Sequence, residues 1–347
     1  MIERAPAAVP TILTVIGTTT ALYFADAVLA PVAGALFIIA ILWPLQSRLQ
    51  VHLPRVLALA IVAALLLGIF LVFMSLLTLS FGRIGRSLMA DVGQFQLLYT
   101  RLAEWLEGHG IPLGGVWADN FNSRVLLRVL QGISARLNTM VAFWLVVLVY
   151  VILGLLEVPD LGNRIRRLAD SRNAAHMIKG FALASSRIRR YLLIRTIMSA
   201  ATGLAVWALA AAFGLRLAAE WGIVAFALNY IPFIGPWIAT LLPTCYALAQ
   251  FQSPQSALVV FACLSAAQFV IGSYIEPRVA GNTLGISPSL VLFSVFLWTF
   301  LWGIFGAFIG VPITIAVLAF CTQFASTRWI AELWGTEGVA NGELERS

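Results

Sequence analysis

Long apolar stretches separated by short polar connections make up most of the chain. Several of them contain no charged residue, and the clearest are 56–81, 138–156 and 257–275. A helix of ~20 apolar residues crosses the ~30 Å hydrocarbon core of a bilayer, and these stretches lack the period-two alternation of membrane β-barrel strands. The pattern predicts an all-α polytopic membrane protein with about six to eight transmembrane helices.

The pattern changes twice before the middle of the chain. Shorter apolar stretches at 10–25 and 28–43 predict a transmembrane hairpin ahead of the third span, whereas 82–137 mixes charged and apolar residues. In this mixed segment apolar residues recur at spacings of three and four, which is typical of an amphipathic helix. They are Val92, Phe95, Tyr99, Leu102 and Leu106. We therefore expect an extramembrane helical insert here.

These changes divide the chain into five predicted parts. They are an N-terminal transmembrane hairpin with the third span (1–81), the extramembrane insert (82–137), a fourth span with a basic cytoplasmic loop (138–190), a transport core (191–327) and a C-terminal tail (328–347). Arginines are concentrated in the connection at 164–195, and short loops rich in Arg and Lys stay in the cytoplasm. Both chain termini are then predicted to be cytoplasmic.

Two apolar stretches, 216–251 and 286–324, are longer than one crossing needs and are broken by glycine and proline. The first break reads N-Y-I-P-F-I-G-P at 229–236, and the second reads G-I-F-G-A-F-I-G-V-P at 303–312. Irregular backbone at membrane depth persists only where protein or a water-filled cavity surrounds it, and paired broken helices are typical of solute sites in transporters. The pattern favours two re-entrant hairpins of opposite sense. Strongly tilted, kinked helices are the alternative.

The residues at the two breaks are the predicted substrate-binding residues. Pro232 lacks an N–H and its ring clashes with the preceding turn, which frees a carbonyl near Leu228 for a polar solute. The alternative is a proline kink stapled by a neighbouring helix, and for the glycines the alternative is close helix packing. The full set is Asn229, Tyr230, Pro232, Gly235, Pro236, Gly303, Gly306, Gly310 and Pro312.

Three polar side chains in or beside the span 257–275 are predicted to gate or couple transport. Glu276 and Arg278 flank Pro277 at the span end, where the proline is expected to prevent a continuous helix. They form either a gating or coupling pair or a structural clasp. Gln268 lies within the span, where a polar side chain faces the bundle interior. A plain interhelical hydrogen bond is the other interpretation of Gln268.

The remaining polar residues argue against several other functions. The formal net charge is +7, but the arginines lie beside apolar stretches, which indicates membrane topology rather than nucleic-acid binding. Arg189, Arg190 and Arg195 are interpreted in this way, as membrane anchors. The three cysteines and three histidines lack metal-binding spacing, and no phosphate-binding glycine loop is present. We expect no metal, no cofactor and no enzymatic activity.

The order of these motifs resembles the autoinducer-2 exporter (AI-2E) family of bacterial permeases. The matching features are R-R-Y-L at 189–192, N-Y-I-P-F-I-G-P, I-E-P-R-V-A-G at 275–281, L-G-I-S-P at 284–288 and the glycine-rich second break. The resemblance covers residues 10–323. It implies a homo-oligomeric inner-membrane protein that exports small molecules without an ATPase subunit. The family also includes members proposed to exchange sodium or lithium for protons.

We therefore predict an inner-membrane secondary transporter that exports a small polar molecule, an autoinducer-2-like signal or a metabolite, by alternating access. A sodium(lithium)/proton antiporter is the first alternative. Such exchange needs a carboxylate deep in the membrane, and the candidates lie near span ends: Asp26, Glu157, Glu220 and Glu276. A non-transporting membrane scaffold is the second alternative. The expected partners are the solute, the lipid bilayer and further copies of the chain, with no nucleic acid.

Overall fold

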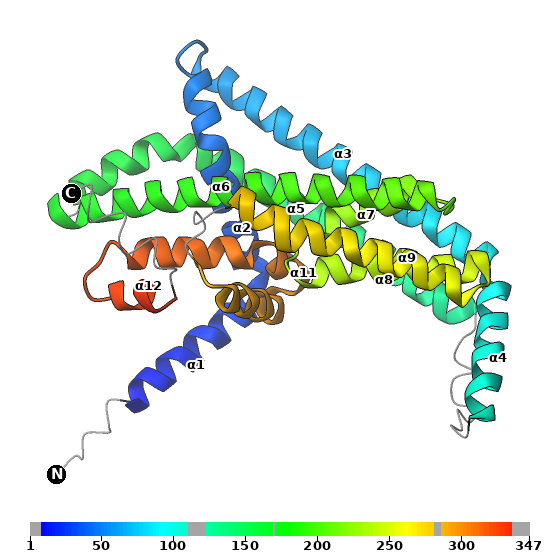
Figure 1. Cartoon of the computed structure of the whole chain (residues 1–347). Helices are drawn as coiled ribbons and strands as arrows, with labels where there is room; N and C mark the ends of the chain where they lie inside the picture. Colours follow the sequence, from blue (N-terminus) through cyan, green and yellow to red (C-terminus); the bar gives the residue numbers. More distant parts are fainter. Residues whose placement is uncertain (1–7, 110–122, 169–170, 281–285, 335–347) are drawn as a thin grey trace. The chain divides into compact units, whose positions relative to one another are not determined.

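Every regular element that the structure describes is a helix. The computed structural model describes residues 8–109, 123–168, 171–280 and 286–334 (Figure 1). In chain order the elements are α1 (Ala8–Phe24), α2 (Asp26–Leu49), α3 (Arg55–Ala90), α4 (Val92–Gly108), α5 (Ser123–Leu168), α6 (Ser171–Ala212), α7 (Ala218–Leu228), α8 (Ile234–Phe251), α9 (Pro254–Phe269), the π-helix η1 (Val270–Ile275), α10 (Glu276–Ala280), α11 (Pro288–Cys321) and α12 (Arg328–Trp334). The predicted all-α class is confirmed over these ranges.

Six of the described helices are long and apolar enough to cross a membrane. Their ranges are Asp26–Leu49, Arg55–Ala90, Thr139–Leu161, Ala175–Ala212, Pro254–Val279 and Pro288–Cys321. The first helix, α1, has 17 residues and extends about 25 Å, slightly less than the ~30 Å hydrocarbon core. The chain is therefore a multi-pass helical membrane protein, as predicted.

Three helices continue through positions where the sequence pattern changes. α3 extends past residue 82, α5 past 138 and α6 past 191, while the amphipathic repeat at 92–106 lies in α4. The described part of 164–195 is helical on both sides of 169–170, so the expectation of a loop is wrong. The reason is composition, because Arg, Ala, Leu and Lys favour helix and this segment contains no proline.

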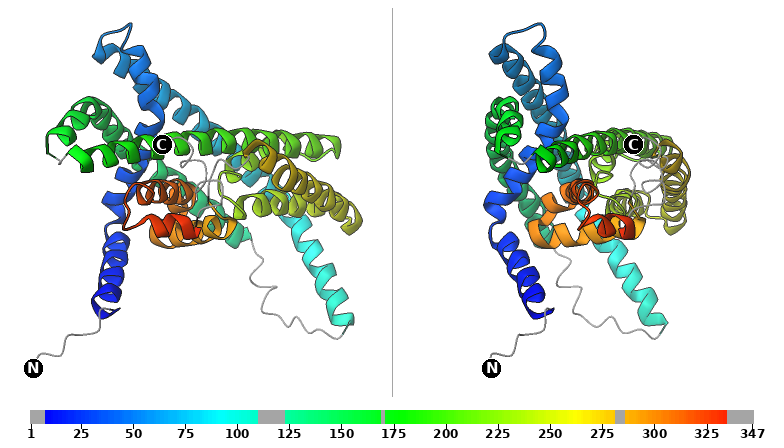
Figure 2. Two further views of the ribbon diagram at one scale, coloured as in Figure 1. Left: turned by 60° about the vertical axis from the view of Figure 1, so that its left-hand side comes forward. Right: turned by 90° about the vertical axis from the view of Figure 1, so that its left-hand side faces the viewer.

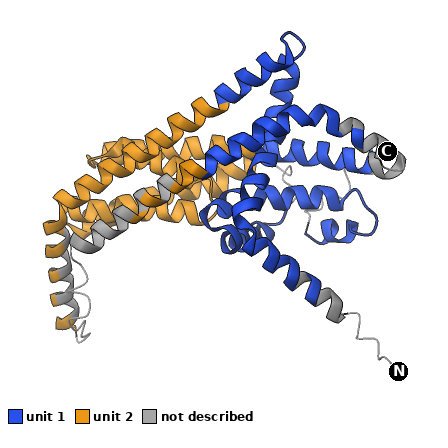
Figure 3. Ribbon diagram, turned by 180° about the vertical axis from the view of Figure 1, so that it is seen from behind, with its two compact units in different colours: residues 1–65, 143–191, 282–347 blue, residues 66–142, 192–281 orange. Residues whose placement is uncertain are grey.

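Two compact units make up the chain (Figure 3). The first unit comprises residues 1–65, 143–191 and 282–347, and the second comprises 66–142 and 192–281. Each unit combines segments that are far apart in the sequence. The predicted transport core at 191–327 is divided between them, because its first interrupted stretch belongs to the second unit and its other interrupted stretch belongs to the first.

A backbone carbonyl that a proline leaves unpaired in α2 is bonded by a side chain from α6, within the first unit. Pro44 has no N–H, so the carbonyl of Ala40 loses its helical donor. The Arg189 guanidinium donates a hydrogen bond to that carbonyl, with an Nη1–O distance of 3.0 Å. Arg189 was interpreted from sequence as a membrane anchor, and the structure adds a packing role for its side chain.

The carbonyl that Pro159 leaves unpaired in α5 is bonded in the same way. Pro159 leaves the carbonyl of Leu155 without its helical donor. The fully buried side chain of Gln46 donates to this carbonyl at 3.4 Å. Arg55, at the start of α3, donates to the next carbonyl, that of Leu156. Buried carbonyls need a hydrogen-bond partner, and these side chains join α2, α3 and α5 by supplying one.

We expect Arg189→Met to lower the free energy of unfolding by about 1–3 kcal/mol, because the Ala40 carbonyl is left without a donor. In a Pro44→Ala background the helix regains the N–H that pairs with this carbonyl, so the same substitution should cost much less. Thermal unfolding of the four proteins of this double-mutant cycle in detergent measures the difference. Arg190→Met, which changes an exposed side chain, is the matched control. Equal losses in both backgrounds would assign Arg189 to another contact.

The core of the second unit surrounds the helices that carry the first interruption. α8 lies beside both α7 and α9, as the views in Figure 1 and Figure 2 also show. α6 and α7 meet at two glycines, because a Cβ on Gly203 would come within 2.9 Å of the Gly222 carbonyl oxygen. Small residues permit such close helix contact in membranes. The buried core residues include Val206, Trp221, Val224, Tyr246, Val260 and Leu264.

Candidate functional site

The first interrupted stretch folds into a helical hairpin of α7 and α8. The rings of Trp221 near the start of α7 and Tyr246 near the end of α8 are 5.5 Å apart, so the two helices run in opposite directions. Gln250 closes the open end of the hairpin by accepting from the N–H of Arg216 and donating to the carbonyl of Gly214, each at 2.9 Å. α7 has 11 residues and extends about 16 Å, which is too short to cross a membrane. The prediction of a helical hairpin is confirmed here, and the alternative of a single kinked span is wrong.

The open end of the hairpin is held by a charged residue of α3 and by another in the turn between α3 and α4. Arg83 pairs with Glu220 at 2.7 Å, and Arg216 pairs with Asp91 at 3.1 Å. The carboxylates of Glu220 and Asp91 are buried, while both arginines are more than half exposed. This end of the hairpin is therefore anchored by two ion pairs.

The turn at 229–233 has an unusual backbone. The carbonyl of Leu228, which Pro232 deprives of its helical donor, accepts from the N–H of Ile231 at 2.9 Å. The expectation of a free carbonyl near Leu228 is therefore wrong, because a tighter turn satisfies it. Phe233 has φ 63° and ψ −57°, and the N–H after it bonds to the carbonyl before it at 2.7 Å. This is a γ-turn of the strained form, which is rare for a residue other than glycine.

Gly235 allows the turn to close. A Cβ at this position would collide with the carbonyl oxygen of Leu228 and would lie 3.2 Å from the Cα of Asn229. Because the obstacle is backbone, no side-chain rotation relieves it. Pro236 follows in the first turn of α8, where the absence of an N–H is tolerated. Both residues were predicted to bind solute, and the structure gives them a local role in shaping the turn.

Two side chains of the turn bond to α6. The Asn229 amide donates to the Ser199 hydroxyl at 3.4 Å, and the Tyr230 and Thr196 hydroxyls are 2.9 Å apart. Asn229 and Ser199 are buried at 4% and 0% exposure. Asn229 and Tyr230 were predicted site residues, whereas their partners on α6 were not.

Arg195 lies on the same segment of α6 and is also buried. Its Nη1 donates to Glu276 of α10 at 3.0 Å. Its Nε has no hydrogen-bond partner among the described residues. Its interpretation as an interfacial membrane anchor is wrong. The sequence signal that identifies it is the spacing of Arg195, Ser199 and Thr202, which places three polar residues on one face of an apolar helix.

The Glu276-Pro277-Arg278 segment is helical, contrary to expectation. The π-helix η1 leads directly into α10, which begins at Glu276. A π-helix is wider than an α-helix, so the proline ring is accommodated without ending the helix. Arg278 does not share the ion pair of Glu276; its guanidinium lies 5.3 Å from the centroid of the Tyr274 ring.

Gln268, the third predicted gating residue, lies in α9 two helical turns before Glu276. Its amide nitrogen is buried, as expected for a side chain that faces the interior. It makes no hydrogen bond with the described residues, so the expected interhelical bond from this donor is not formed.

The polar side chains of α6 near the turn, together with the turn and α10 residues that bond to them, are called the polar cluster from here on. They comprise Arg195, Thr196, Ser199, Thr202, Asn229, Tyr230 and Glu276, all in the second unit. Buried polar groups are costly unless paired, yet the Arg195 Nε and the Thr202 hydroxyl have no partner in the described structure. Across the described ranges no group of three or more His, Cys, Asp or Glu is placed to hold a metal ion. The polar cluster offers donors and acceptors suited to an organic solute.

The second interrupted stretch, α11, folds back on itself in the first unit. Its backbone leaves the helix at Trp302 and at Gly303, which has φ 61° and ψ −144°. A Cβ on Gly306 would collide with the Trp298 carbonyl oxygen, and one on Gly310 would come within 3.0 Å of the Ser294 carbonyl oxygen. The predicted break is confirmed, and both glycines pack against the preceding arm.

The turn of α11 contacts the end of α1. Trp302 donates from its indole N–H to the carbonyl of Leu22 at 3.1 Å, and Pro312 is buried in the second arm. A solute-binding role for Gly303, Gly306, Gly310 and Pro312 remains a prediction. The idea that both breaks line one site also remains a prediction, since the breaks belong to different units.

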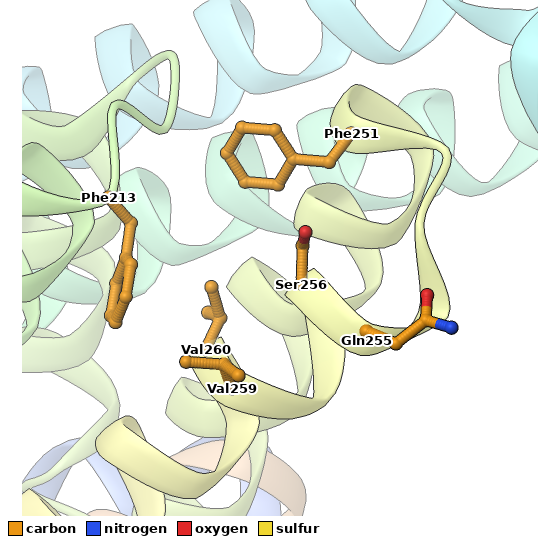
Figure 4. A pocket seen from close by; sticks show the side chains of 6 residues that line it. All are labelled: Phe213, Phe251, Gln255, Ser256, Val259 and Val260. Atoms are coloured by element: carbon orange, nitrogen blue, oxygen red, sulfur yellow. The ribbon is translucent and has the colours of Figure 1, made fainter.

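A pocket of ≈ 330 Å³ lies at the other end of α8 from the turn (Figure 4). Phe213 and Phe251 approach it from the ends of α6 and α8, and α9 supplies the remaining residues: Gln255, Ser256, Val259 and Val260. The Ser256 hydroxyl already bonds to Ser253 at 3.2 Å. None of the predicted site residues lines this pocket.

The chain is similar to known transport proteins over most of its length. The family model described as AI-2E family transporter matches residues 12–326. The AI-2 transport protein TqsA of Escherichia coli (strain K12) is 31% identical over 315 residues, which cover 89% of this chain and 90% of TqsA. A putative transport protein of Haemophilus influenzae is 25% identical over 300 residues, covering 84% and 85%. The putative transport protein YhhT of Escherichia coli (strain K12) is 34% identical over 137 residues, covering 40% and 39%.

Proposed function

The chain belongs to the AI-2E family of transporters, and from this premise we propose that it exports a small polar molecule by alternating access. It is a multi-pass membrane transport protein. TqsA is named for AI-2 transport, and the proposed substrate class here is an AI-2-like signal or a related metabolite. The proposal further includes the inner membrane, cytoplasmic termini, a homo-oligomer and no ATPase subunit.

The polar cluster is the observation that carries this proposal. Polar and ionisable groups inside an apolar helical protein are costly and are usually functional. Here they gather where a short helix turns back within the unit, which is the arrangement expected of a solute site in a transporter. Hydroxyl and amide groups from α6 and the turn supply the directional contacts that a small polar solute requires.

Alternating access fits the way in which the turn is held. The open end of the hairpin is fixed by two ion pairs, whereas the turn contacts α6 through the side-chain bonds of Asn229 and Tyr230. The strained backbone at Phe233 adds free energy to this conformation of the turn. A solute that replaces the two bonds to α6 would therefore favour an opened turn.

The placement of charge along the sequence supports the proposed outward direction. The arginines of 164–195 favour a cytoplasmic location for the connection between α5 and α6. Because α6 is long enough to cross the membrane and the hairpin follows it directly in sequence, the proposal puts the start of the hairpin on the outer side. A solute taken up at the turn from the cytoplasm and released past the open end moves outward.

Purified protein in sealed vesicles tests the proposal. We expect flux of one or more members of a panel of small hydroxylated metabolites, and an initial rate at least about tenfold lower for Asn229→Ala, because a buried hydrogen-bonding partner of the solute is lost. Tyr230→Phe should reduce the rate as well. Tyr274→Phe, which removes the hydroxyl of an exposed tyrosine, is the matched control.

The alternatives give different results in the same vesicles. A scaffold gives no flux of any panel member, with or without a proton gradient. An antiporter gives sodium- or lithium-dependent proton movement that Glu276→Gln abolishes. Identical flux in wild type and Asn229→Ala would show that transport does not depend on the polar cluster.

A further inference from the structure

The ion pair between Arg195 and Glu276 is asymmetric in its burial. The Arg195 side chain is 6% exposed, whereas the Glu276 side chain is 33% exposed. Arg195 lies in the middle of α6, and Glu276 lies at the start of the five-residue α10. The carboxylate is therefore the partner that can leave the pair for solvent, and the guanidinium is the partner that stays.

Glu276 uses only part of the guanidinium. Its Oε1 accepts from Nη1 at 3.0 Å, while the Nε–H of Arg195 has no partner among the described residues. Arginine presents several N–H donors in a planar fork that matches the oxygens of carboxylate and phosphate. One buried donor of this fork is thus available, and the unpaired Thr202 hydroxyl lies on the same face of α6.

We infer that the polar cluster takes solutes with an oxyanion group, a carboxylate or a phosphate, which binds Arg195 in place of Glu276. This inference rests on the proposed function, because it names the substrate class of the same site. Removing one partner of a buried ion pair leaves an uncompensated charge, which is strongly unfavourable. If Glu276 leaves Arg195, the arriving group must itself be negative. A neutral solute does not meet that condition.

In this proposal, Glu276 competes with the solute anion for the guanidinium of Arg195. It keeps Arg195 neutralised while the site is empty, and it lowers the apparent affinity for the solute anion because the two compete for one guanidinium. The hydrogen bonds of Ser199, Asn229 and Tyr230 then select among anions by their uncharged part. An empty site remains closed, and an occupied one carries the same net charge as the empty one once Glu276 faces solvent.

The test measures anion binding by full-length protein in a neutral detergent. The unfolding temperature is followed against the concentration of acetate, inorganic phosphate or neutral acetamide at constant ionic strength. We expect saturable stabilisation by the anions, with half-saturation of Glu276→Gln at a concentration about tenfold or more below that of wild type, because the internal competitor is gone. Glu276→Asp, one methylene shorter, should be intermediate. Arg195→Gln should show no saturable anion effect.

Asp91→Asn is the matched control, since it removes a buried carboxylate from another arginine pair of the same unit. It should leave the anion response as in wild type. An identical response of wild type and both Glu276 variants overturns the inference, as does equal stabilisation of Glu276→Gln by acetamide. A response to phosphatidylglycerol with none to acetate assigns the anion to a lipid headgroup and also overturns a solute site.

Vesicle flux separates this inference from the proposed function. Anion stabilisation that depends on Arg195, without flux of any panel member, supports the anion site and contradicts the transport proposal. Flux restricted to neutral metabolites, with Arg195→Gln as active as wild type, supports transport and overturns the anion site.

Discussion

Gly235→Ala is expected to abolish solute flux and to lower the free energy of unfolding by about 3 kcal/mol. The added methyl group would occupy the space of the Leu228 carbonyl oxygen and press on the Cα of Asn229. Since both obstacles are backbone, the turn has to open. Opening it moves Asn229 and Tyr230 away from Ser199 and Thr196, so the polar cluster loses both bonds between the hairpin and α6.

The measurements are the unfolding temperature in detergent and the initial flux in vesicles. Gly68→Ala is the matched control, because nothing lies within 4 Å of a Cβ at this position of α3. Alanine is the better helix former by about 1 kcal/mol, so this control should be as stable as wild type or more so. A Gly235→Ala protein with normal stability and flux would contradict the turn described here.

The positions of both hairpins were predictable because glycine and proline act locally. Pro232 and Gly303 cannot continue a regular helix at low cost, and α7–α8 and α11 each reverse at the predicted break. What the sequence did not show is how each broken backbone is satisfied. The Leu228 carbonyl is paired within the turn itself, and no local pattern distinguishes that outcome from a carbonyl open to solute.

Proline has three different structural outcomes in this chain, of which the turn after Pro232 is the first. The carbonyls freed by Pro44 and Pro159 are paired by side chains that are distant in sequence, from Arg189 and Gln46. The clash at Pro277 is relieved by the preceding π-helix. A proline therefore predicts a local disturbance of the α-helix, and the three-dimensional neighbours decide whether it is met by a distant side chain, by a turn or by a wider helix.

Arg195 shows why the site was only partly predictable. Arginines beside an apolar stretch usually mark the cytoplasmic side of a membrane, and Arg190 next to it in sequence is exposed as that rule expects. Arg195 is buried because a carboxylate 81 residues later reaches it. Long-range pairing of this kind leaves no local trace except the polar face shared with Ser199 and Thr202.

Gly303→Ala is expected to lower the free energy of unfolding by about 1–3 kcal/mol through backbone strain alone. The residue has φ 61° and ψ −144°, and nothing lies within 4 Å of an added Cβ, so no steric contact contributes. This conformation is outside the left-handed helical region that asparagine tolerates, where ψ is positive.

Gly303→Asn is therefore expected to be as destabilised as Gly303→Ala, and thermal unfolding in detergent compares the two. Gly17→Ala in α1, where a Cβ also meets nothing within 4 Å, is the control and should not be destabilised. Rescue by asparagine would place the turn in the left-handed helical region. The two arms of α11 would then meet at a different angle, and the packing of Gly306 and Gly310 against Trp298 and Ser294 would have to be revised.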